Sequence, residues 1–434
     1  MTTRQPMPDG AVLVAIDVAK HRNEILIEAP ASLRRRRLTI LNTREEHDRL
    51  VGALTGYEPP VVVGFEATGN YHRPLAHRLL EAGLELRLIS SLALARTRQA
   101  LTNGWDKNDP KDAQVILHML RIGAVQHYHD PLAHGLLDLQ ELSKTHEMVS
   151  RAKTELWHRL LTHYLPLYFP EAERFRGNTR SDWFLALLEA FPTPSSITAM
   201  SKEEFITAAW SLVGRKVSKR CLLADIYETA SNSIGLPIGP DSDAVALVGE
   251  RPHRGRPGSS SLRMTLAEGR SLIRQRDEIE RRAELMLAED TDYRRLRTIP
   301  GLGPINVLTI LAEAGDLRRF AHHRQFLKFC GLDLATHQSG TFRGQTKLSK
   351  FGNARLRKTF WLAAQVATRQ RDNSFRTKFE RYIAPDRNSP DRRRKALTAI
   401  AAKMARTAHA IVKGGVDYRP FFEGAVPGGR TPLG

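Results

Sequence analysis

Apolar runs of strand length dominate the beginning of the chain. The segment AVLVAIDVAK (11–20) is continuously apolar until it reaches Asp17. RNEILIEA (22–29) and RRRRLTIL (34–41) follow at the short distances that hairpins use. The pattern therefore predicts three consecutive strands.

Two helix patterns and two more strand patterns come next. TREEHDRLVGALTG predicts a helix with Thr43 as its N-cap and Glu46 three places later, ending at Gly56. PPVVVGFEATG (59–69) predicts a buried strand that runs into Glu66, and YHRPLAHRLLEAG and LELRLIS predict a helix and a fifth strand. The order βββαβαβ predicts a mixed α/β sheet with an antiparallel hairpin side and a parallel side.

From about residue 135 the apolar spacing becomes that of helices. LLDLQELSKTHEMVSRAKTELWHRLLTHYL is long enough for an extended helix or a coiled-coil arm. The stretch 235–261 is rich in Pro, Gly and Ser, which predicts a loop or linker. Helix patterns return at 266–289 and 392–413, and the residues from Gly414 onward predict a poorly ordered tail. We expect an α/β part followed by a largely helical part.

Composition adds a probable class of partner to this outline. The 434 residues are 41% hydrophobic, which is enough for two or three domains with real cores. Lys and Arg number 66 against 47 Asp and Glu, giving a formal net charge of +19. Such a charge is typical of proteins that bind a phosphate-bearing polyanion, although a merely basic surface would give the same composition.

Other classes of protein are excluded by what the chain contains. Cys221 and Cys330 are its two cysteines, too few for a disulfide framework or a structural zinc site within one chain. Its apolar runs fall short of the roughly 20 residues of a membrane span, and MTTRQPMPDG lacks the apolar core of a signal peptide. We therefore expect a cytoplasmic protein with no membrane partner.

Acidic residues follow two of the predicted strands. Asp17 and Glu66 lie near the carboxyl ends of separate apolar strands, where side chains of neighbouring strands meet at one edge of an α/β sheet. In NDPKDAQVILHML (108–120), Asp109 and Asp112 are three residues apart, on one side of a first helical turn. Pairing with arginine and an ordinary helix start are the simpler interpretations. Together, four hard oxygen donors suit Mg²⁺ and phosphodiester chemistry.

A basic stretch lies far downstream. Residues 336–360 contain no Asp or Glu and six cations, which are Arg343, Lys347, Lys350, Arg355, Arg357 and Lys358. Upstream, IPGLGPINVLTIL (299–311) has the shape of a helix-hairpin-helix turn, where Gly301 and Gly303 would let the backbone approach a phosphate. The basic stretch predicts contacts with a nucleic-acid backbone, and a solvated basic face is the alternative.

Ser339 precedes these cations between polar and glycine neighbours. A serine hydroxyl is a poor nucleophile unless a base, a metal or a strong field activates it. Ser339 could be a turn residue, a phosphate contact or a nucleophile toward phosphorus, and its chemistry alone favours the turn.

Taken in order, these motifs resemble one family. Two sets of motifs are similar to the DEDD transposases of the insertion sequence 110 group, also called bridge recombinases. The first set lies within about 11–125 and comprises AIDVAK, GFEATGNYH and KNDPKDA. The second lies within about 293–385 and comprises LRTIPGLGP, FLKFCGL and SGTFRGQTKLSKFGNARLR. Region 135–290 matches this family only in its helical character.

The resemblance implies a domain order and a set of site residues. It implies a RuvC-like domain of the ribonuclease H fold at 1–130, a helical coiled-coil arm at 131–290, a mainly helical transposase domain at 291–413 and a tail at 414–434. The acid tetrad falls on Asp17, Glu66, Asp109 and Asp112, and the serine nucleophile on Ser339. The family's acid motif could also be aligned so that Asp106 takes the place of Asp109. We prefer Asp109 and Asp112, because the segment AQVILHML that follows Asp112 matches the helix that the family places there.

The function implied is that of a bacterial, nucleoid-associated enzyme that excises and inserts a mobile element. Its partners would be donor and target DNA, a structured non-coding guide RNA, and further copies of itself in a dimer or tetramer. Ser339 would become joined to a DNA phosphate while Mg²⁺ bound by the acids of a partner subunit completes the site. Two alternatives remain, a RuvC-like junction nuclease without a covalent step and a non-catalytic nucleic-acid-binding protein.

Overall fold

The computed structural model describes a large part of the chain. The described residues are 7–30, 34–58, 60–67, 69–102, 109–130, 132, 134–177, 182–214, 218–236, 262–339 and 342–420. At 102, 109–111, 262–265, 336–339, 342, 343 and 345 only the backbone is described. The contacts divide the chain into two compact units, Met1–Leu137 and Asp138–Gly434, and each is described by itself.

The first unit is built around a six-stranded sheet in the order β3-β2-β1-β4-β5-β6. Its strands are β1 (Val12–Asp17), β2 (Arg22–Glu28), β3 (Arg36–Leu41), β4 (Val61–Glu66), β5 (Glu85–Ile89) and β6 (Gln126–His127). β1, β4 and β5 are parallel, whereas β2, β3 and β6 pair antiparallel with their neighbours. The mixed α/β prediction for this part of the chain is therefore confirmed.

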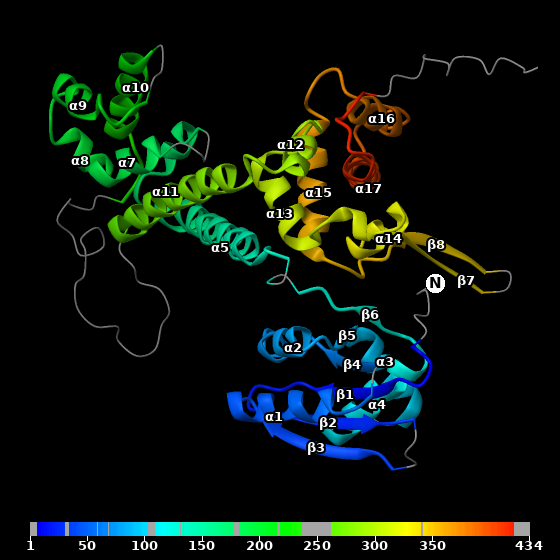
Figure 1. Cartoon of the computed structure of the whole chain (residues 1–434). Coiled ribbons are helices and arrows are strands. Elements are labelled where there is room, and N and C mark those ends of the chain that lie inside the picture. The colour runs from blue at the N-terminus through cyan, green and yellow to red at the C-terminus, as the bar shows by residue number, and fades with distance from the viewer. Residues whose placement is uncertain are drawn as a thin grey trace, which may run out of the picture. The chain divides into compact units, whose positions relative to one another are not determined.

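Helices cover both faces of this sheet (Figure 1). They are α1 (Arg44–Thr55), α2 (His72–Glu81), α3 (Ser91–Thr102) and α4 (Asp109–Arg121). Thr43 caps α1 as predicted, since its side chain accepts a hydrogen bond from the backbone N–H of Glu46. Helix α3 and the short strand β6 are elements that the sequence pattern did not predict.

Alternate residues of β1 belong to two different cores. Val12, Val14 and Ile16 pack with residues of α1 and α2, whereas Leu13 and Ala15 pack with residues of α3 and α4. Successive side chains of a strand point to opposite faces, so a strand covered on both sides is apolar throughout. This is why AVLVAI contains no polar position.

Helix α4 approaches the sheet most closely at Gly64 of β4. A Cβ atom at Gly64 would lie 2.7–2.8 Å from the Cγ and Cδ atoms of Leu120, a fully buried residue of α4. Any larger residue at this position would push α4 away from the strand. Gly64 therefore determines how near the sheet the whole of α4 can lie.

The second unit is mostly helical, as predicted. Its first part comprises α5 (Leu137–Arg159), the π-helix η1 (Leu160–Tyr164), α6 (Leu165–Tyr168), the 3-10 helix η2 (Pro170–Phe175), α7 (Trp183–Ala190), α8 (Pro194–Thr198), α9 (Lys202–Ala209), α10 (Lys219–Ser231) and α11 (Leu262–Leu287). The predicted linker at 235–261 falls almost wholly outside the described residues.

Helices α5 and α11 run side by side in opposite directions (Figure 1). His146 lies 3.5 Å from Glu280, and ten residues later Leu156 lies against Gly269. Leu142, Val149 and Leu156 form the shared core with Leu272 and Ile279, so both helices contribute residues at seven-residue intervals. That spacing is the one used along a two-helix seam.

The second part of this unit has its own core and carries a hairpin. It comprises α12 (Thr291–Arg297), α13 (Pro304–Ala314), the 3-10 helix η3 (Leu317–Arg319), α14 (His323–Phe329), β7 (Leu334–Ser339), β8 (Phe342–Leu348), α15 (Ala354–Ala367), α16 (Ser374–Ile383) and α17 (Pro390–Gly414). Residues 421–434 of the predicted tail lie outside the described residues. No helix among the described parts of the chain combines the length and apolarity needed to cross a membrane.

The contact at Gly64 can be tested by a pair of glycine substitutions. We expect Gly64→Ala to destabilise the first unit by about 1–3 kcal/mol, because its methyl group overlaps Leu120 in a packed core. Gly52→Ala is the matched control: Gly52 lies within α1 with nothing within 4 Å of its Cβ position, so alanine should stabilise by about 1 kcal/mol. Hydrogen–deuterium exchange of β4 and α4 peptides measures both effects, and unchanged protection in Gly64→Ala would contradict the role of this contact.

Candidate functional site

Asp17 and Glu66 end two adjacent parallel strands on the same face of the sheet. Asp17 follows Leu13 and Ala15 on the face of β1 that α4 covers, and Glu66 follows Val62 in the same way on β4. Ile16 and Phe65 are register partners, so the two acids come one residue later at the same edge. Both are partly buried. The alternation of the strands thus brings these two carboxylates together.

Helix α4 brings a third acid to this edge. Asp112 lies in the first turn of α4 and is 3% exposed, eight residues before the Leu120 that packs against Gly64. A buried carboxylate requires a partner. Arg98 of α3 supplies it, with its Nε 2.6 Å from Oδ1 of Asp112. Arg98 lies one helical turn beyond the buried Leu94, on the α3 face that packs toward α4.

Asp17, Glu66 and Asp112 all line one pocket of about 360 Å³. Lys20, Tyr71 and Arg98 line it as well. Asp109, the fourth predicted acid, is the first residue of α4, and its side chain lies outside the described set. Of the four acids, the structure therefore brings three into one pocket. Arg98 was missed by the sequence analysis, although its position four residues after an apolar Leu94 was a usable signal.

The chemistry of this pocket suits a hard cation, and one of its acids is paired with an arginine. Carboxylate oxygens are the ligands that Mg²⁺ prefers. Within the described residues, no group of three or more His, Cys, Asp or Glu side chains is arranged to hold a metal ion. The Asp112 carboxylate is directed to Arg98. The donors are thus of the right kind, and an ion would compete with Arg98 for one of them.

Ser339 ends strand β7, beside the turn of the β7–β8 hairpin. Its backbone pairs with Phe342 of β8, and its side chain is outside the described residues. Nearby, Cys330 is fully buried, and burial raises the pKa of its thiol far above the ordinary range. A thiol that stays protonated is a poor nucleophile, so Cys330 does not compete with Ser339 for that role.

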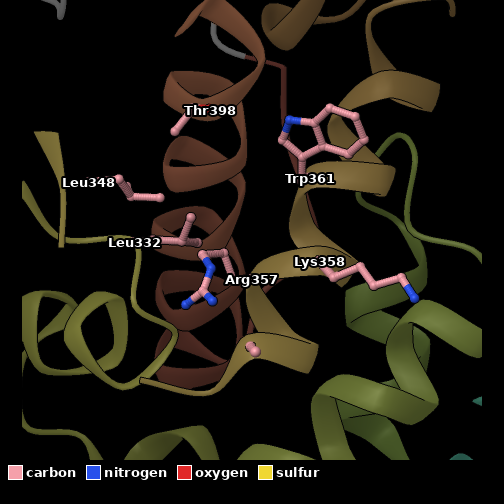
Figure 2. Close-up of a pocket in the computed structure, with 7 residues that line it drawn as sticks. Leu332, Leu348, Arg357, Lys358, Trp361 and Thr398 are labelled. Atoms are coloured by element: carbon pink, nitrogen blue, oxygen red, sulfur yellow. The ribbon is translucent and has the colours of Figure 1, made fainter. Parts of the chain in front are cut away.

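Two cations of the predicted basic stretch line a second, smaller pocket (Figure 2). Arg357 and Lys358 come from α15 and lie with Trp361 around a cavity of about 330 Å³ at the base of the hairpin. Lys358 reaches away from Leu332 and from Leu348, the last residue of β8, and is 66% exposed. Lys347 and Lys350 are also exposed, whereas the side chain of Arg343 lies outside the described residues. Lys358 lies 3.8 Å from Glu147, a long and exposed ion pair that a backbone phosphate could replace.

Arg355 has a different environment from its neighbours. Its guanidinium forms ion pairs with Glu313 and Glu147, the latter at 2.6 Å, and donates a hydrogen bond to Ser143 Oγ at 2.9 Å. The side chain is 22% exposed. These contacts join α15 to α13 and α5. A phosphate would have to displace two carboxylates to bind this arginine.

The predicted turn at Gly301 and Gly303 lies between α12 and α13. Gly301 has φ +89°, and a Cβ atom there would lie 2.4 Å from the Ala363 carbonyl oxygen of α15. Its glycine is therefore required for packing within the protein. Gly303 is the N-cap of α13, and its Cβ position meets nothing nearer than Arg297 at 4.0 Å. Only the second glycine leaves room for a ligand.

Comparison with known proteins gives two family matches that cover different motifs. The first lies mostly in the first unit and extends into the second, and the other lies within the second unit. Residues 14–170 match the DEDD model of IS110 elements, described as "Transposase", and residues 293–380 match the "Transposase IS116/IS110/IS902 family". The first match contains Asp17, Glu66, Asp109 and Asp112. The second contains Ser339 and the basic stretch.

Several curated proteins are similar over parts of the chain. A "Probable family 20 transposase" of Pseudomonas aeruginosa is 28% identical over 33% of this chain and 41% of its own length. The "Transposase for insertion sequence element IS1111A" of Coxiella burnetii is 38% identical over 15% of this chain and 18% of its own length. The "Insertion element IS110 uncharacterized 43.6 kDa protein" of Streptomyces coelicolor is 22% identical over 80% of both chains. The chain thus spans less than half the length of the first two.

The different environments of Arg355 and Lys358 lead to opposite expectations. Arg355→Met should destabilise the second unit by about 1–3 kcal/mol, because it leaves the 15%-exposed carboxylate of Glu313 without its cation. Lys358→Met should change stability by less than about 0.5 kcal/mol, because the side chain is largely in solvent. Thermal unfolding measures both. Equal stability of the two variants would contradict a structural role for Arg355.

Proposed function

Because the chain belongs to the IS110 family of transposases, as the matches in its two units indicate, we propose that it cleaves and joins DNA to excise and insert an insertion sequence. The observation that carries this proposal is the gathering of Asp17, Glu66 and Asp112 at one sheet edge. In the proposal the first unit has a RuvC-like ribonuclease H fold. The strand order β3-β2-β1-β4-β5, with an antiparallel β1–β2–β3 side, supports that assignment.

In this proposal Mg²⁺ is bound by Asp17, Glu66 and Asp112, with Asp109 as the fourth ligand. Bound there, Mg²⁺ would stabilise negative charge on the phosphate oxygens and polarise an attacking oxygen. The carboxylates by themselves repel a phosphodiester, so neutralisation of the pocket is needed before DNA can enter. Lys20 lies in the same pocket and contributes positive charge to it. A bound ion would compete with Arg98 for the Asp112 carboxylate.

Ser339 is the proposed nucleophile. Its Oγ attacks the phosphorus of the scissile linkage, forming an Oγ–P bond while the P–O bond to the leaving sugar breaks. The serine proton passes to solvent or a nearby base, and the leaving sugar oxygen takes up a proton. The position of Ser339 beside the turn of a two-stranded hairpin supports this role, because a hairpin end can enter a groove of DNA.

The remaining parts of the proposal concern partners. Donor DNA, target DNA and a structured guide RNA bind along the exposed cations of the basic stretch and at Gly303. A second copy of the chain supplies the acids that meet Ser339. The antiparallel pairing of α5 with α11 supports a coiled-coil arm between the two domains. The net charge of +19 supports a partner rich in phosphates.

Charge-neutral substitutions test the acidic pocket. We expect Asp17→Asn, Glu66→Gln and Asp112→Asn each to lower DNA cleavage at least about a hundredfold without weakening DNA binding, because they remove a metal ligand and a negative charge but no phosphate contact. Cleavage of labelled junction DNA in Mg²⁺ and binding in its absence measure the two effects.

Glu24→Gln is the matched control for these variants. Glu24 is the register partner of Asp17, but its carboxylate accepts a hydrogen bond from Thr39 Oγ1 at 3.0 Å and does not line the pocket. It should retain cleavage within a few-fold of the unsubstituted chain. Equal losses in Asp17→Asn and Glu24→Gln would show a general effect on the sheet instead.

The covalent step has its own test. Ser339→Ala should abolish a protein–DNA adduct that survives denaturation, whereas Ser349→Ala, whose hydroxyl bonds Asp333 at the far end of the hairpin, should retain it. Denaturing gel electrophoresis with labelled DNA detects the adduct. If Ser339→Ala cleaves normally and Asp17→Asn does not, the protein is a junction nuclease that uses water. If intact protein binds DNA and cleaves none in Mg²⁺, it is a binding protein.

A further inference from the structure

A large cavity lies at the carboxy-terminal end of the second unit, and no residue of the basic stretch 336–360 is among the described residues that line it. It has a volume of about 890 Å³ and is formed by α16, α17 and the residues that follow α17 as far as Arg419. Helices α16 and α17 lie close together in Figure 1. Most of the lining lies beyond residue 380, where the second family match ends. Neither the sequence motifs nor the comparisons give this cavity a role.

The charge of the lining is entirely positive. Four cations and no Asp or Glu are among the described residues that line it; the cations are Lys378, Arg381, Lys403 and Arg419. Two come from α16, one from α17 and one from the segment beyond it. Cations from three elements around one concave surface create a positive potential stronger than each would create on a flat surface. The cavity is therefore suited to an anion.

One wall of the cavity is held by a connected set of contacts. The ring of Tyr418 stacks on Phe375 with 5.6 Å between centroids, and its hydroxyl lies 2.8 Å from Ser374 Oγ. Lys403 lies over the same Phe375 ring at 5.3 Å and donates a hydrogen bond to Ser374 Oγ at 3.3 Å. The Tyr418 backbone N–H also donates to Thr298 Oγ1 at 2.9 Å. The segment after α17 is thus fixed against α16, and the wall exists before a ligand binds.

An exposed aromatic ring stands at this cavity. Tyr382 is 44% exposed, and the ammonium of Lys378 lies 5.8 Å from its ring centroid. Proteins that bind single strands combine a cationic groove for phosphates with aromatic rings on which bases stack. In a duplex the base faces are stacked on one another and cannot reach such a ring. The combination of four cations with Tyr382 therefore favours an unpaired strand over a double helix.

We propose that this cavity binds a single-stranded segment of nucleic acid, with phosphates on Lys378, Arg381, Lys403 and Arg419 and a base against Tyr382. The choice of a nucleic acid among polyanions rests on the proposed function. The phosphodiester and the base are common to RNA and DNA. The hydroxyls of Thr377 and Thr407, which also line the cavity, are able to bond a ribose 2′-hydroxyl and would favour RNA.

The test measures binding to the full chain carrying Asp17→Asn, so that cleavage plays no part in the result. The probes are labelled twelve-nucleotide single-stranded RNA and DNA of mixed sequence, a duplex DNA of the same length, and inorganic polyphosphate. The double variant Lys378→Ala/Arg381→Ala should weaken single-strand binding about tenfold or more. It should also make the plot of log binding constant against log salt concentration less steep by about 1.4, since each of the two lost phosphate contacts contributes about 0.7 to the slope. Tyr382→Leu should weaken binding of the single-stranded oligonucleotides about tenfold and leave the binding of polyphosphate unchanged, because polyphosphate has no base to stack.

The matched control is Arg387→Ala/Arg393→Ala, which removes two exposed cations of the same unit that do not line the cavity. It should weaken binding less than threefold. Arg381→Lys should retain most of the binding, which separates charge from folding. The proposal is overturned if both double variants lose binding equally, if the cavity variant loses duplex binding only, or if Tyr382→Leu has no effect. If the unsubstituted chain binds the single-stranded probes with normal affinity but cleaves no DNA in Mg²⁺, the catalytic proposal is overturned and this one is left intact.

Discussion

The close packing of α4 on the sheet at Gly64 is the constraint on which the acidic pocket depends. Asp17 and Glu66 are positioned by their strands alone, through alternation and register. Asp112 belongs to a separate helix, and it reaches the same edge only because Leu120 can lie directly against a residue without a side chain. A wider separation would move Asp112 away from the other two carboxylates. One missing methyl group in the core therefore determines the geometry of the pocket.

The burial of Asp112 has an electrostatic consequence. A buried carboxylate beside two others would be costly without a cation, and Arg98 neutralises it. The most deeply buried of the three carboxylates is thus paired in the structure. A divalent ion would be a stronger partner for the same oxygens, so the pair with Arg98 maintains the site without closing it to a metal.

The 66 Lys and Arg residues do not form one uniform binding surface. Arg98 and Arg355 each neutralise acids inside the protein, whereas Lys358 is 66% exposed with Glu147 at 3.8 Å, and Lys378 lines a cavity with no Asp or Glu among its described lining residues. The net charge therefore overestimates the number of phosphate contacts. A distinction between the two kinds of cation requires the positions of the acids, which composition does not contain.

Local patterns were sufficient for strands β1 to β5, for the N-cap of α1 and for the placement of Asp17 and Glu66 at the ends of their strands, because strand alternation and capping depend on near neighbours in the chain. The β7–β8 hairpin was not predicted, since LATHQS and FRGQTKL carry no regular alternation of apolar and polar residues. The packing role of Gly301, the pairing of Arg355 with Glu313 and the cavity beside α16 were also invisible to sequence reasoning. Each depends on residues far apart in the sequence that meet only after the helices have packed. The sequence by itself determined which residues could perform chemistry and at which ends of which elements they lie. The tertiary structure alone decided which of them meet and which cations remain open to a ligand, because the free energy of a charge depends on its neighbours in space.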